Sequence, residues 1–583
     1  MRIRSPRASS PAHRLLLLVI LMMGLLILRL AWLQLFQGSA FLGQSRDNQF
    51  LEKRIPSARG LVLDRQGQAL ALNVTACELS LSRRALESDS TLAPIICRIL
   101  DWPEKRLEAL YQEALEEKLS RIVLERDLDQ ERILRVEERL PDLPSLRLRD
   151  WARRTYPRGE LAAHILGYVG EVSREELETW RGSSRAYFPA DLMGRSGVER
   201  RYQDRLRGQD GKELFLVNAR GSLLQTVERL EPVEGETLRL SLDIGLCAVL
   251  DSALAEWGLG AGVVMDIESG DLLAAASRPA FDPNFLSGGM TATEWNKLRE
   301  DPSRPMFNRV LQAGYAPGST FKPLVALAAL EEKLLHRSSF EPCGGGLDLG
   351  TRYFRCWLSS GHGKVSMESS LERSCDVYYY QIGDAIGVDP IADMARRFGM
   401  GSRTGLDLGS EQAGLVPDSD YYNRRFGKGR WTRGYAWNLS IGQGEYLCTP
   451  LQMAIVYAGL ARGDILPSPK LLLGESLPSS RRAKKLGIEE PHLRRIRKGL
   501  FRVMEGPLGT ARESAVPGIP SAGKTGTVQN PHGLEHAWFC GYAPAKNPRI
   551  AIALIVEHGE HGTDIAPIFS RLVEYWLRER GEF

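Results

Sequence analysis

The stretch Gly260–Ser277, GAGVVMDIESGDLLAAAS, decides how the largest part of this chain folds. Two apolar runs flank the polar turn at residues 268–271, which is the pattern of two antiparallel strands. A third apolar run, RIAIALIVEH, lies near the C-terminus at Arg549–His558. Helical patterns fall between these runs, at Thr320–Leu335 and Pro491–Met504. This order predicts an α+β domain whose first and last strands share one antiparallel sheet flanked by helices.

The region before this domain has a different pattern. RGLVLDRQGQALALN, at Arg59–Asn73, predicts a β-hairpin with a tight turn. From about Leu81 to Leu146 the chain is rich in Glu, Arg and Leu at helical spacing, as in ALEEKLSRIVLERDLDQERILRVEERL, which predicts amphipathic helices. Their polar faces are either solvated or contact a partner. We expect an elongated non-catalytic domain at 45–235 and a second domain at 240–583.

The N-terminus predicts a membrane anchor. Residues 1–14 carry four arginines, one histidine and no acid, and Leu15–Phe36 is apolar except for Arg29 and Gln34. About 20 apolar residues suffice to cross a bilayer, and basic flanks stay in the cytoplasm. We therefore expect a cytoplasmic tail at 1–14, a single transmembrane helix at 15–36 and the remainder outside the cytoplasm. The alternative is a cleaved signal peptide with a weak cleavage-like site at Gly38–Ala40.

Composition limits the classes of function. The chain has 583 residues, 43% hydrophobic and 25% charged, which is enough for a large core and at least one further domain. Its net charge is only +4, and no long basic run occurs beyond the first residues. Nucleic acid is therefore not an expected partner.

Three short motifs occur in an order that serine acyltransferases use. They are STFK at Ser319–Lys322, SCD at Ser374–Asp376 and KTGT at Lys524–Thr527. Each motif alone is common by chance, so the evidence lies in their order. Pro317 and Gly318 break the chain before the first motif, which predicts that a helix starts at Ser319.

The residue types in these motifs suit acyl transfer. On a helix, Lys322 lies one turn from Ser319 and can take its hydroxyl proton if burial and a nearby cation lower the lysine pKa. Lys524 is the expected cation. Ser374, between the two lysines, can relay a proton to the leaving amine, and Asp376 can hold this network in position.

The third motif suits substrate binding. The stretch SAGKTGTVQ, at Ser521–Gln529, has the small residues of a strand edge that can pair with a peptide. We expect Thr525, Gly526 and Thr527, with the lysine before them, to bind a peptide that ends in a carboxylate. The backbone N–H groups of Ser319 and Thr527 are the expected oxyanion donors.

A possible metal site lies between the first two motifs. Cys343, Cys356, His362 and Cys375 form C-x12-C-x5-H-x12-C, and three thiolates with one imidazole suit structural zinc. The alternative is a disulfide between Cys343 and Cys356. The remaining cysteines follow no ligand spacing, and Cys540 is expected in the core.

These residues, with the anchor, RGLVLDRQG and GRSGVERRYQDRLRG (Gly194–Gly208), resemble the class B penicillin-binding proteins along essentially the whole chain. Asp376 and EHAWFCGYAP, at Glu535–Pro544, resemble the elongation-type members. The resemblance implies a pedestal domain of the dimerisation type and a transpeptidase domain in the periplasm. It also implies acylation of Ser319 by stem peptides ending in D-alanyl-D-alanine, transfer to a second stem, and sensitivity to β-lactams. A RodA-type glycosyltransferase and other elongation proteins are the implied partners at the inner membrane. Some such relatives carry zinc on Asp, Asp, His and Cys near this position.

The sequence leaves two alternative classes of function. A β-lactamase or carboxypeptidase would transfer the acyl group to water, but class A lactamases add Glu-x-x-Leu-Asn, and the only Leu-Asn pair here is Leu72-Asn73 in the early hairpin. A mainly structural activator of a glycosyltransferase would not need an acylating serine. Replacing Ser319 separates the structural role from catalysis.

Overall fold

The computed structural model describes residues 11–37, 50–116, 120–180, 187–189, 191–218, 223–288, 290, 292–334, 341–406, 408–463, 465–475, 483–530, 533–579 and 581. The chain divides into two compact units. The first contains Met1–Arg59 and Arg207–Gly235, and the second contains Gly60–Leu206 and Glu236–Phe583.

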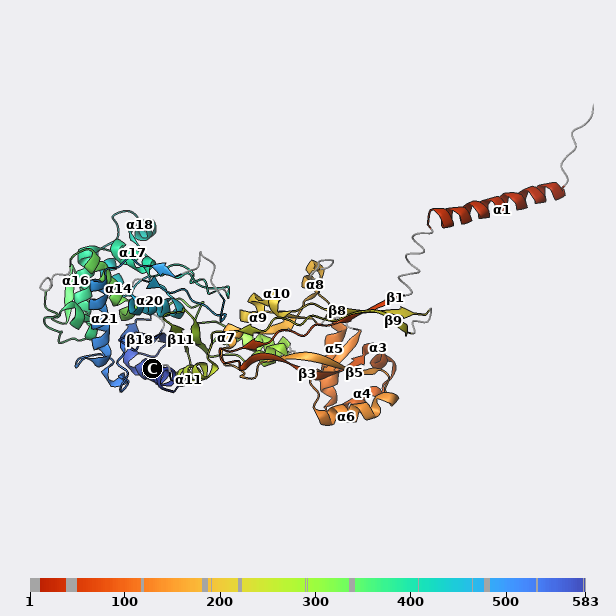
Figure 1. The fold of residues 1–583 in the computed structure, drawn as a ribbon, viewed down its shortest axis with the longest axis horizontal. Coiled ribbons are helices and arrows are strands. Elements are labelled where there is room, and N and C mark those ends of the chain that lie inside the picture. Colours follow the sequence, from red (N-terminus) through yellow and green to blue (C-terminus); the bar gives the residue numbers. More distant parts are fainter. Residues whose placement is uncertain are drawn as a thin grey trace, which may run out of the picture. The chain divides into compact units, whose positions relative to one another are not determined.

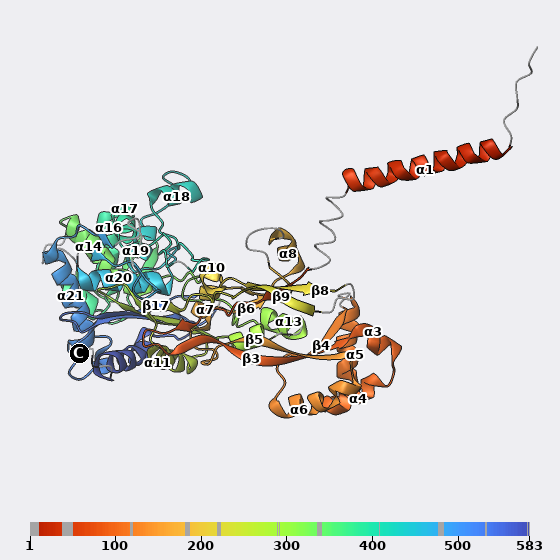
Figure 2. The same ribbon diagram turned by 45° about the vertical axis from the view of Figure 1, so that its right-hand side comes forward.

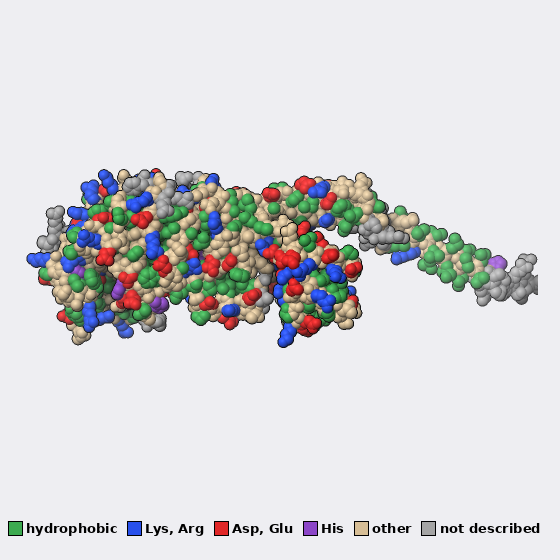
Figure 3. Space-filling view, turned by 90° about the horizontal axis from the view of Figure 1, so that it is seen from below, with side chains coloured by type: hydrophobic (Ala, Val, Ile, Leu, Met, Phe, Trp, Pro, Cys, Tyr) green, Lys and Arg blue, Asp and Glu red, His purple; other side chains and the backbone are tan. Residues whose placement is uncertain are grey.

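In the first unit, the helix α1 (Pro11–Leu35) contains the apolar N-terminal segment. Its stretch Leu15–Leu35 is long and apolar enough to cross a membrane and is the one such helix in the described ranges. Hydrophobic side chains cover its surface (Figure 3). This helix fits a single-pass anchor like the one expected at 15–36. Residues 1–10 of the expected tail and the alternative cleavage site at Gly38–Ala40 lie outside the described residues.

The first unit also contains a three-stranded antiparallel sheet. Its strands are β1 (Phe50–Ile55), β8 (Gly211–Val217) and β9 (Leu223–Leu230), with β8 in the centre. Arg54 donates to Asp210 at 2.6 Å, and the backbone N–H of Ser57 donates to the same carboxylate at 2.9 Å. These contacts join the end of β1 to the residue that precedes β8.

The second unit begins with the expected hairpin, formed by β2 (Val62–Leu63) and β3 (Ala69–Ser82). In its turn, Asp64 Oδ1 accepts the backbone N–H groups of Gln66 and Gln68, each at 2.8 Å. The short strand β10 (Leu238–Arg239) pairs in parallel with β2. The turn chemistry read from the sequence is therefore confirmed.

A helical lobe follows, with a hydrophobic core of its own (Figures 1 and 2). Its elements are α3 (Arg83–Ser88), α4 (Leu92–Leu100), α5 (Glu104–Glu116), β4 (Arg121–Glu125), α6 (Gln130–Arg139) and β5 (Leu146–Thr155). The helical prediction is wrong at Arg121–Glu125. This stretch pairs with β3 as a strand because Ile122 and Leu124 alternate into the core, where the period of two prevails over the helical spacing of its neighbours.

The motif Gly194–Gly208 closes this region around a buried ion pair. The intervening elements are α7 (Ala163–Leu166), β6 (Val169–Glu171), α8 (Arg174–Trp180), β7 (Leu192–Gly194), α9 (Gly197–Arg201) and α10 (Gln203–Leu206). Glu199 of the motif accepts a hydrogen bond from Arg154 of β5 at 2.7 Å, and both side chains are buried. Arg154 also donates to the carbonyl of Gly60 at 2.7 Å. Removing either partner would leave an uncompensated buried charge.

The large remaining domain is built on a five-stranded antiparallel sheet in the order β12-β11-β19-β18-β17. These strands are β12 (Leu272–Arg278), β11 (Gly260–Asp266), β19 (Ile550–Val556), β18 (His536–Ala543) and β17 (Ala522–Val528). The first strand in sequence, β11, pairs with the last, β19, as predicted. The KTGT motif lies on β17, at the edge of the sheet, which is also as predicted.

Helices cover both faces of this sheet. Phe539 of β18 packs on Phe569 of α22 (Gly562–Val573), with ring centroids 5.0 Å apart. The neighbouring Trp538 donates from its indole to the carbonyl of Ala316 at 3.0 Å. Because successive strand residues point to opposite faces, the chain leading to Ser319 lies on the face opposite α22.

Most of the remaining elements come between β12 and β17 in the sequence, and α11 precedes β11. They are α11 (Ile244–Ala255), α12 (Pro283–Ser287), α13 (Ala292–Glu300), α14 (Lys322–Glu331), β13 (Gly346–Leu349), β14 (Arg352–Arg355), α15 (Met367–Glu372), α16 (Asp376–Ile386), α17 (Asp389–Arg397), α18 (Ser419–Phe426), α19 (Gly434–Ser440), α20 (Pro450–Arg462), β15 (Ile465–Leu466), β16 (Lys484–Lys485) and α21 (Glu490–Glu505). The helices expected at Thr320–Leu335 and Pro491–Met504 are α14 and α21. Leu335 lies outside the described residues.

Candidate active site

Ser319 lies in a short 3-10 turn, Gly318–Phe321, that leads directly into α14. Gly318 has a φ of +55°, and a Cβ there would lie 2.9 Å from the carbonyl oxygen of Thr527, so the turn approaches β17 as only glycine allows. The backbone N–H of Gly318 donates to the carbonyl of Gly442 at 2.9 Å. Ser319 itself is partly exposed. The turn therefore presents this serine beside the KTGT strand.

Lys322 joins the first two motifs. Its side chain is fully buried, and its Nζ donates to Asp376 Oδ1 at 2.7 Å. The same atom lies 2.9 Å from the carbonyl oxygen of Ser374 and 3.3 Å from its Oγ. Three of the five predicted catalytic residues thus form one hydrogen-bonded group next to the serine turn.

Ser374 is held in a conformation that non-glycine residues rarely adopt. Its φ is +53°, at the junction between α15 and α16. The backbone N–H of the next residue, Cys375, donates to the carbonyl of Ser370 at 3.0 Å. Such strain persists only where surrounding contacts fix the backbone, and it is concentrated at functional sites.

Asp376 has a second partner that the sequence did not predict. Its Oδ2 accepts the backbone N–H of Trp357 at 3.0 Å, and the Trp357 indole donates to the carbonyl of Arg373 at 3.0 Å. The Trp357 side chain nevertheless stays 60% exposed. The only sequence signal for this role of Trp357 is its position directly after Cys356. This tryptophan fixes the Asp376 carboxylate from the side opposite Lys322.

Lys524 contributes a buried cationic group. Burial lowers the pKa of Lys524 well below its ordinary value, and the charge of Lys322 lowers it further, whereas Asp376 acts in the opposite direction. Its Nζ donates to the carbonyl of Thr525 at 3.1 Å. Among the contacts of the described residues, Ser374 is hydrogen-bonded to Lys322 but not to Lys524. Of the two lysine contacts predicted for Ser374, the described residues therefore show the one to Lys322.

The rest of the KTGT strand meets two elements that sequence reasoning missed. The hydroxyls of Thr525 and Thr510 lie 2.8 Å apart, and Gln443 Nε2 donates to the carbonyl of Thr527 at 3.4 Å. Gly526 is buried, and a Cβ there would lie 3.0 Å from the Thr320 side chain. The only sequence signal for Gln443 is its position between two glycines, in GQG at 442–444.

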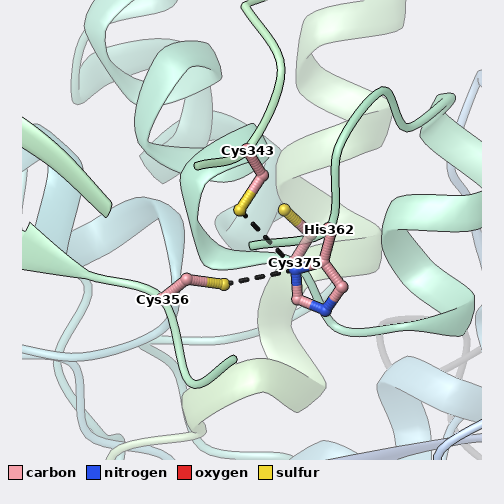
Figure 4. Close-up of side chains that lie close together, drawn as sticks. All are labelled: Cys343, Cys356, His362 and Cys375. Carbon is pink, nitrogen blue, oxygen red and sulfur yellow. Dashed lines mark hydrogen bonds between the residues drawn. The ribbon is translucent and has the colours of Figure 1, made fainter. Parts of the chain in front are cut away.

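The four predicted metal ligands converge (Figure 4). Cys343, Cys356, His362 and Cys375 are buried, and their ligand atoms all lie within 4.8 Å of one another. The sulfurs of Cys356 and Cys343 lie 3.4 and 3.6 Å from His362 Nδ1. A tetrahedral zinc with ordinary Zn–S and Zn–N bonds would separate sulfur from nitrogen by about 3.6 Å. The residues therefore fit a zinc ion. All eight cysteines are free thiols, and Cys540 is buried in the core as expected.

Comparison with known proteins supplies the family. Residues 260–574 match the penicillin binding protein transpeptidase domain, and residues 54–240 match the penicillin-binding protein dimerisation domain. The chain is 33% identical to peptidoglycan D,D-transpeptidase MrdA of Acinetobacter baumannii, over 97% of this chain and 87% of that protein.

Solved structures agree with this match. Penicillin-binding protein PBP2 of Helicobacter pylori, in complex with MreC, has a TM-score of 0.81 and 29% identity, covering 92% of this chain and all of that one. A chain of a peptidoglycan synthase complex has a TM-score of 0.74 and 29% identity, covering 98% of this chain and 99% of that one. The present chain therefore belongs to the class B penicillin-binding proteins, as a member of the penicillin-binding protein 2 type. The family resemblance and the expected fold class are both confirmed.

Proposed function

We propose that this chain cross-links peptidoglycan as a serine-type D,D-transpeptidase of cell elongation, with Ser319 as the nucleophile. The observation that carries the assignment is the buried group of Lys322, Ser374 and Asp376 beside the serine turn. These residues come from two motifs about 50 positions apart, yet they surround one lysine Nζ. A lysine at this position is the base that a serine nucleophile needs.

In the acylation step, Ser319 Oγ attacks the carbonyl carbon of the penultimate D-alanine while Lys322 takes the hydroxyl proton. The backbone N–H groups of Ser319 and Thr527 stabilise the developing oxyanion. The bond from carbonyl carbon to nitrogen then breaks, and Ser374 passes a proton to the departing D-alanine amine. Ser374 takes the proton that Lys322 received from Ser319, through their 3.3 Å contact, so that this proton leaves with the amine and both side chains return to their starting states.

In the second step, the amine of another stem peptide attacks the acyl ester. A new amide bond forms, the bond between the acyl carbon and Ser319 Oγ breaks, and the proton of the amine returns to Ser319. Thr525, Gly526 and Thr527, with Lys524, bind the terminal carboxylate of the donor peptide along the β17 edge. Asp376 keeps Lys322 in position through its 2.7 Å contact.

Cys343, Cys356, His362 and Cys375 hold a structural zinc ion in this proposal. Zinc would supply a closed four-ligand crosslink and no chemistry. Cys375 lies between Ser374 and Asp376, at the N-cap position of α16. Holding Cys375 would therefore restrict the strained backbone of Ser374 and the orientation of Asp376.

The chain is anchored by α1 in the inner membrane, with its catalytic domain in the periplasm. The proposed boundaries are a tail at 1–14, a membrane helix at 15–36, a pedestal at 45–235 and the transpeptidase domain at 240–583. Its partners are peptidoglycan stem peptides, β-lactams, a RodA-type glycosyltransferase and an MreC-type protein. The PBP2 complex with MreC and the synthase complex support the protein partners.

The test is mass spectrometry of the full chain in detergent after incubation with a labelled penicillin, beside Ser319→Ala. A stable adduct on Ser319 that is absent from the variant is expected, because the acyl-enzyme deacylates slowly without an acceptor amine. Rapid turnover of the drug would favour a hydrolase instead. No adduct in folded wild-type protein would overturn the catalytic assignment and favour the structural role.

A further inference from the structure

The Thr525 hydroxyl has a hydrogen-bond partner from outside the three motifs. Thr510 lies on the segment between α21 and β17, and its Oγ1 is 2.8 Å from Thr525 Oγ1. The Thr525 side chain is buried, whereas Thr510 is partly exposed. Each hydroxyl has one proton and can also accept, so the pair can be arranged in either direction.

The segment that carries Thr510 is fixed by a buried carboxylate. Glu372 is fully buried and forms an ion pair with Arg502 of α21 at 2.8 Å. Glu372 Oε1 also accepts the backbone N–H of Leu508 at 3.3 Å, and its carbonyl accepts that of Thr510 at the same distance. Thr510 is therefore fixed by two hydrogen bonds, one from its backbone N–H to Glu372 and one between its hydroxyl and that of Thr525.

Glu372 precedes Ser374 by only two residues, at the end of α15. The same side chain that fixes the Thr510 segment thus adjoins the second catalytic motif. The contacts of Glu372 with the Thr510 segment, and of Thr510 with Thr525, therefore link the SCD motif to the KTGT motif. A solvated surface loop would need no buried ion pair, because an unpaired charge in the core is strongly destabilising.

We propose that Thr510 is a positioning residue for carboxylate recognition: it donates to Thr525, which thereby donates its own proton to the terminal carboxylate of the substrate. This inference rests on the proposed role of Thr525. An anionic carboxylate can only accept, so in the complex the Thr525 proton points to the ligand and Thr510 is left as the donor. A chain of two such hydrogen bonds polarises the hydroxyl that meets the anion.

The experiment measures acylation of the full chain by two acyl thioesters, one with a carboxylate on its leaving group and one with that carboxylate methylated. Thr510→Val removes the hydroxyl at nearly constant shape, and Thr510→Ser retains it. For Thr510→Val, we expect a roughly fivefold to tenfold loss in kcat/KM with the carboxylate probe and less than about twofold with the methylated probe. Thr510→Ser should restore the wild-type rate on both.

An equal loss on both probes would overturn the proposal, because a general disturbance of the site does not depend on the carboxylate. An unchanged rate on both probes would also overturn it. Thr510→Ala, compared in the same way, replaces Thr510→Val if the valine variant does not fold. Thr525→Val is the reference for the site itself. If it discriminates between the probes as the wild type does, the proposed role of Thr525 fails, independently of Thr510.

Discussion

The candidate catalytic group, Lys322 with Ser374 and Asp376, and the Cys/His cluster meet at the start of α16, and different physical effects act on them. The catalytic group brings two buried lysines near each other and keeps Ser374 at a φ of +53°. The cluster collects four buried soft ligands that a single zinc ion would satisfy together. The first arrangement is unfavourable for folding and useful for chemistry, and the second suits stability. The two arrangements meet at Ser374, Cys375 and Asp376, which are consecutive in the chain.

The largest effect is expected from Lys322→Met, which removes the proposed base at similar volume. Acylation of Ser319 by labelled penicillin should slow by at least about 100-fold, the usual range for loss of general base catalysis. The measurement is the rate of adduct formation by mass spectrometry. Unchanged zinc content and far-UV circular dichroism serve as controls. An acylation rate near that of the wild type would remove Lys322 from the mechanism.

Lys524→Met should lower acylation by a carboxylate-bearing substrate and at the same time raise the free energy of unfolding at neutral pH. Burial and the charge of Lys322 lower the pKa of Lys524 in the folded state below the ordinary value of 10.5. The unfolded chain therefore binds more protons between these two values, and wild-type stability rises with pH across that window. The stability advantage of the variant should shrink as pH rises toward 10.5. An advantage independent of pH would contradict this account.

Loss of the metal should affect stability more than chemistry. The purified protein is expected to hold about one zinc, and Cys343→Ser should lose it and unfold at a lower temperature. Acylation by penicillin should fall roughly tenfold, as for a group that only orients its neighbours. Metal analysis and thermal unfolding provide the two measurements.

The matched control for this variant is Cys448→Ser. Cys448 is buried and donates to the carbonyl of Tyr315 at 3.3 Å, outside the cluster, and serine can keep that bond. Zinc content should not change in this control. A wild-type protein that lacks zinc and contains a Cys343–Cys356 disulfide would contradict the zinc proposal and establish the disulfide instead.

The smallest effect is expected from Trp357→Phe, at the contact between the two regions. Phenylalanine keeps the ring beside His362 but loses the indole hydrogen bond to Arg373. The free energy of unfolding should fall by about 1 kcal/mol, and acylation should slow by about twofold. Chemical denaturation and the penicillin adduct rate measure both effects. A large loss of activity with unchanged stability would assign Trp357 directly to substrate binding.

Much of the fold could be predicted because it follows from local pattern. The apolar runs at Gly260–Ser277 and Arg549–His558 form strands that pair as expected. The exception at Arg121–Glu125 is instructive: within a strongly helical context, two buried alternating residues and a neighbouring strand determined the outcome. Short segments take their structure from their surroundings when the local preference is weak.

The candidate site likewise has features that the sequence predicted and features that only the structure revealed. The sequence by itself determined the long apolar N-terminal helix, the order of the three motifs and the residue types of the Cys/His cluster, because periodicity and side-chain chemistry are local properties. Only the tertiary structure decided that Trp357 holds Asp376, that Gln443 reaches the KTGT strand and that Thr510 meets Thr525. Those contacts join residues distant in sequence, and they depend on how whole helices and strands pack, which no local pattern encodes.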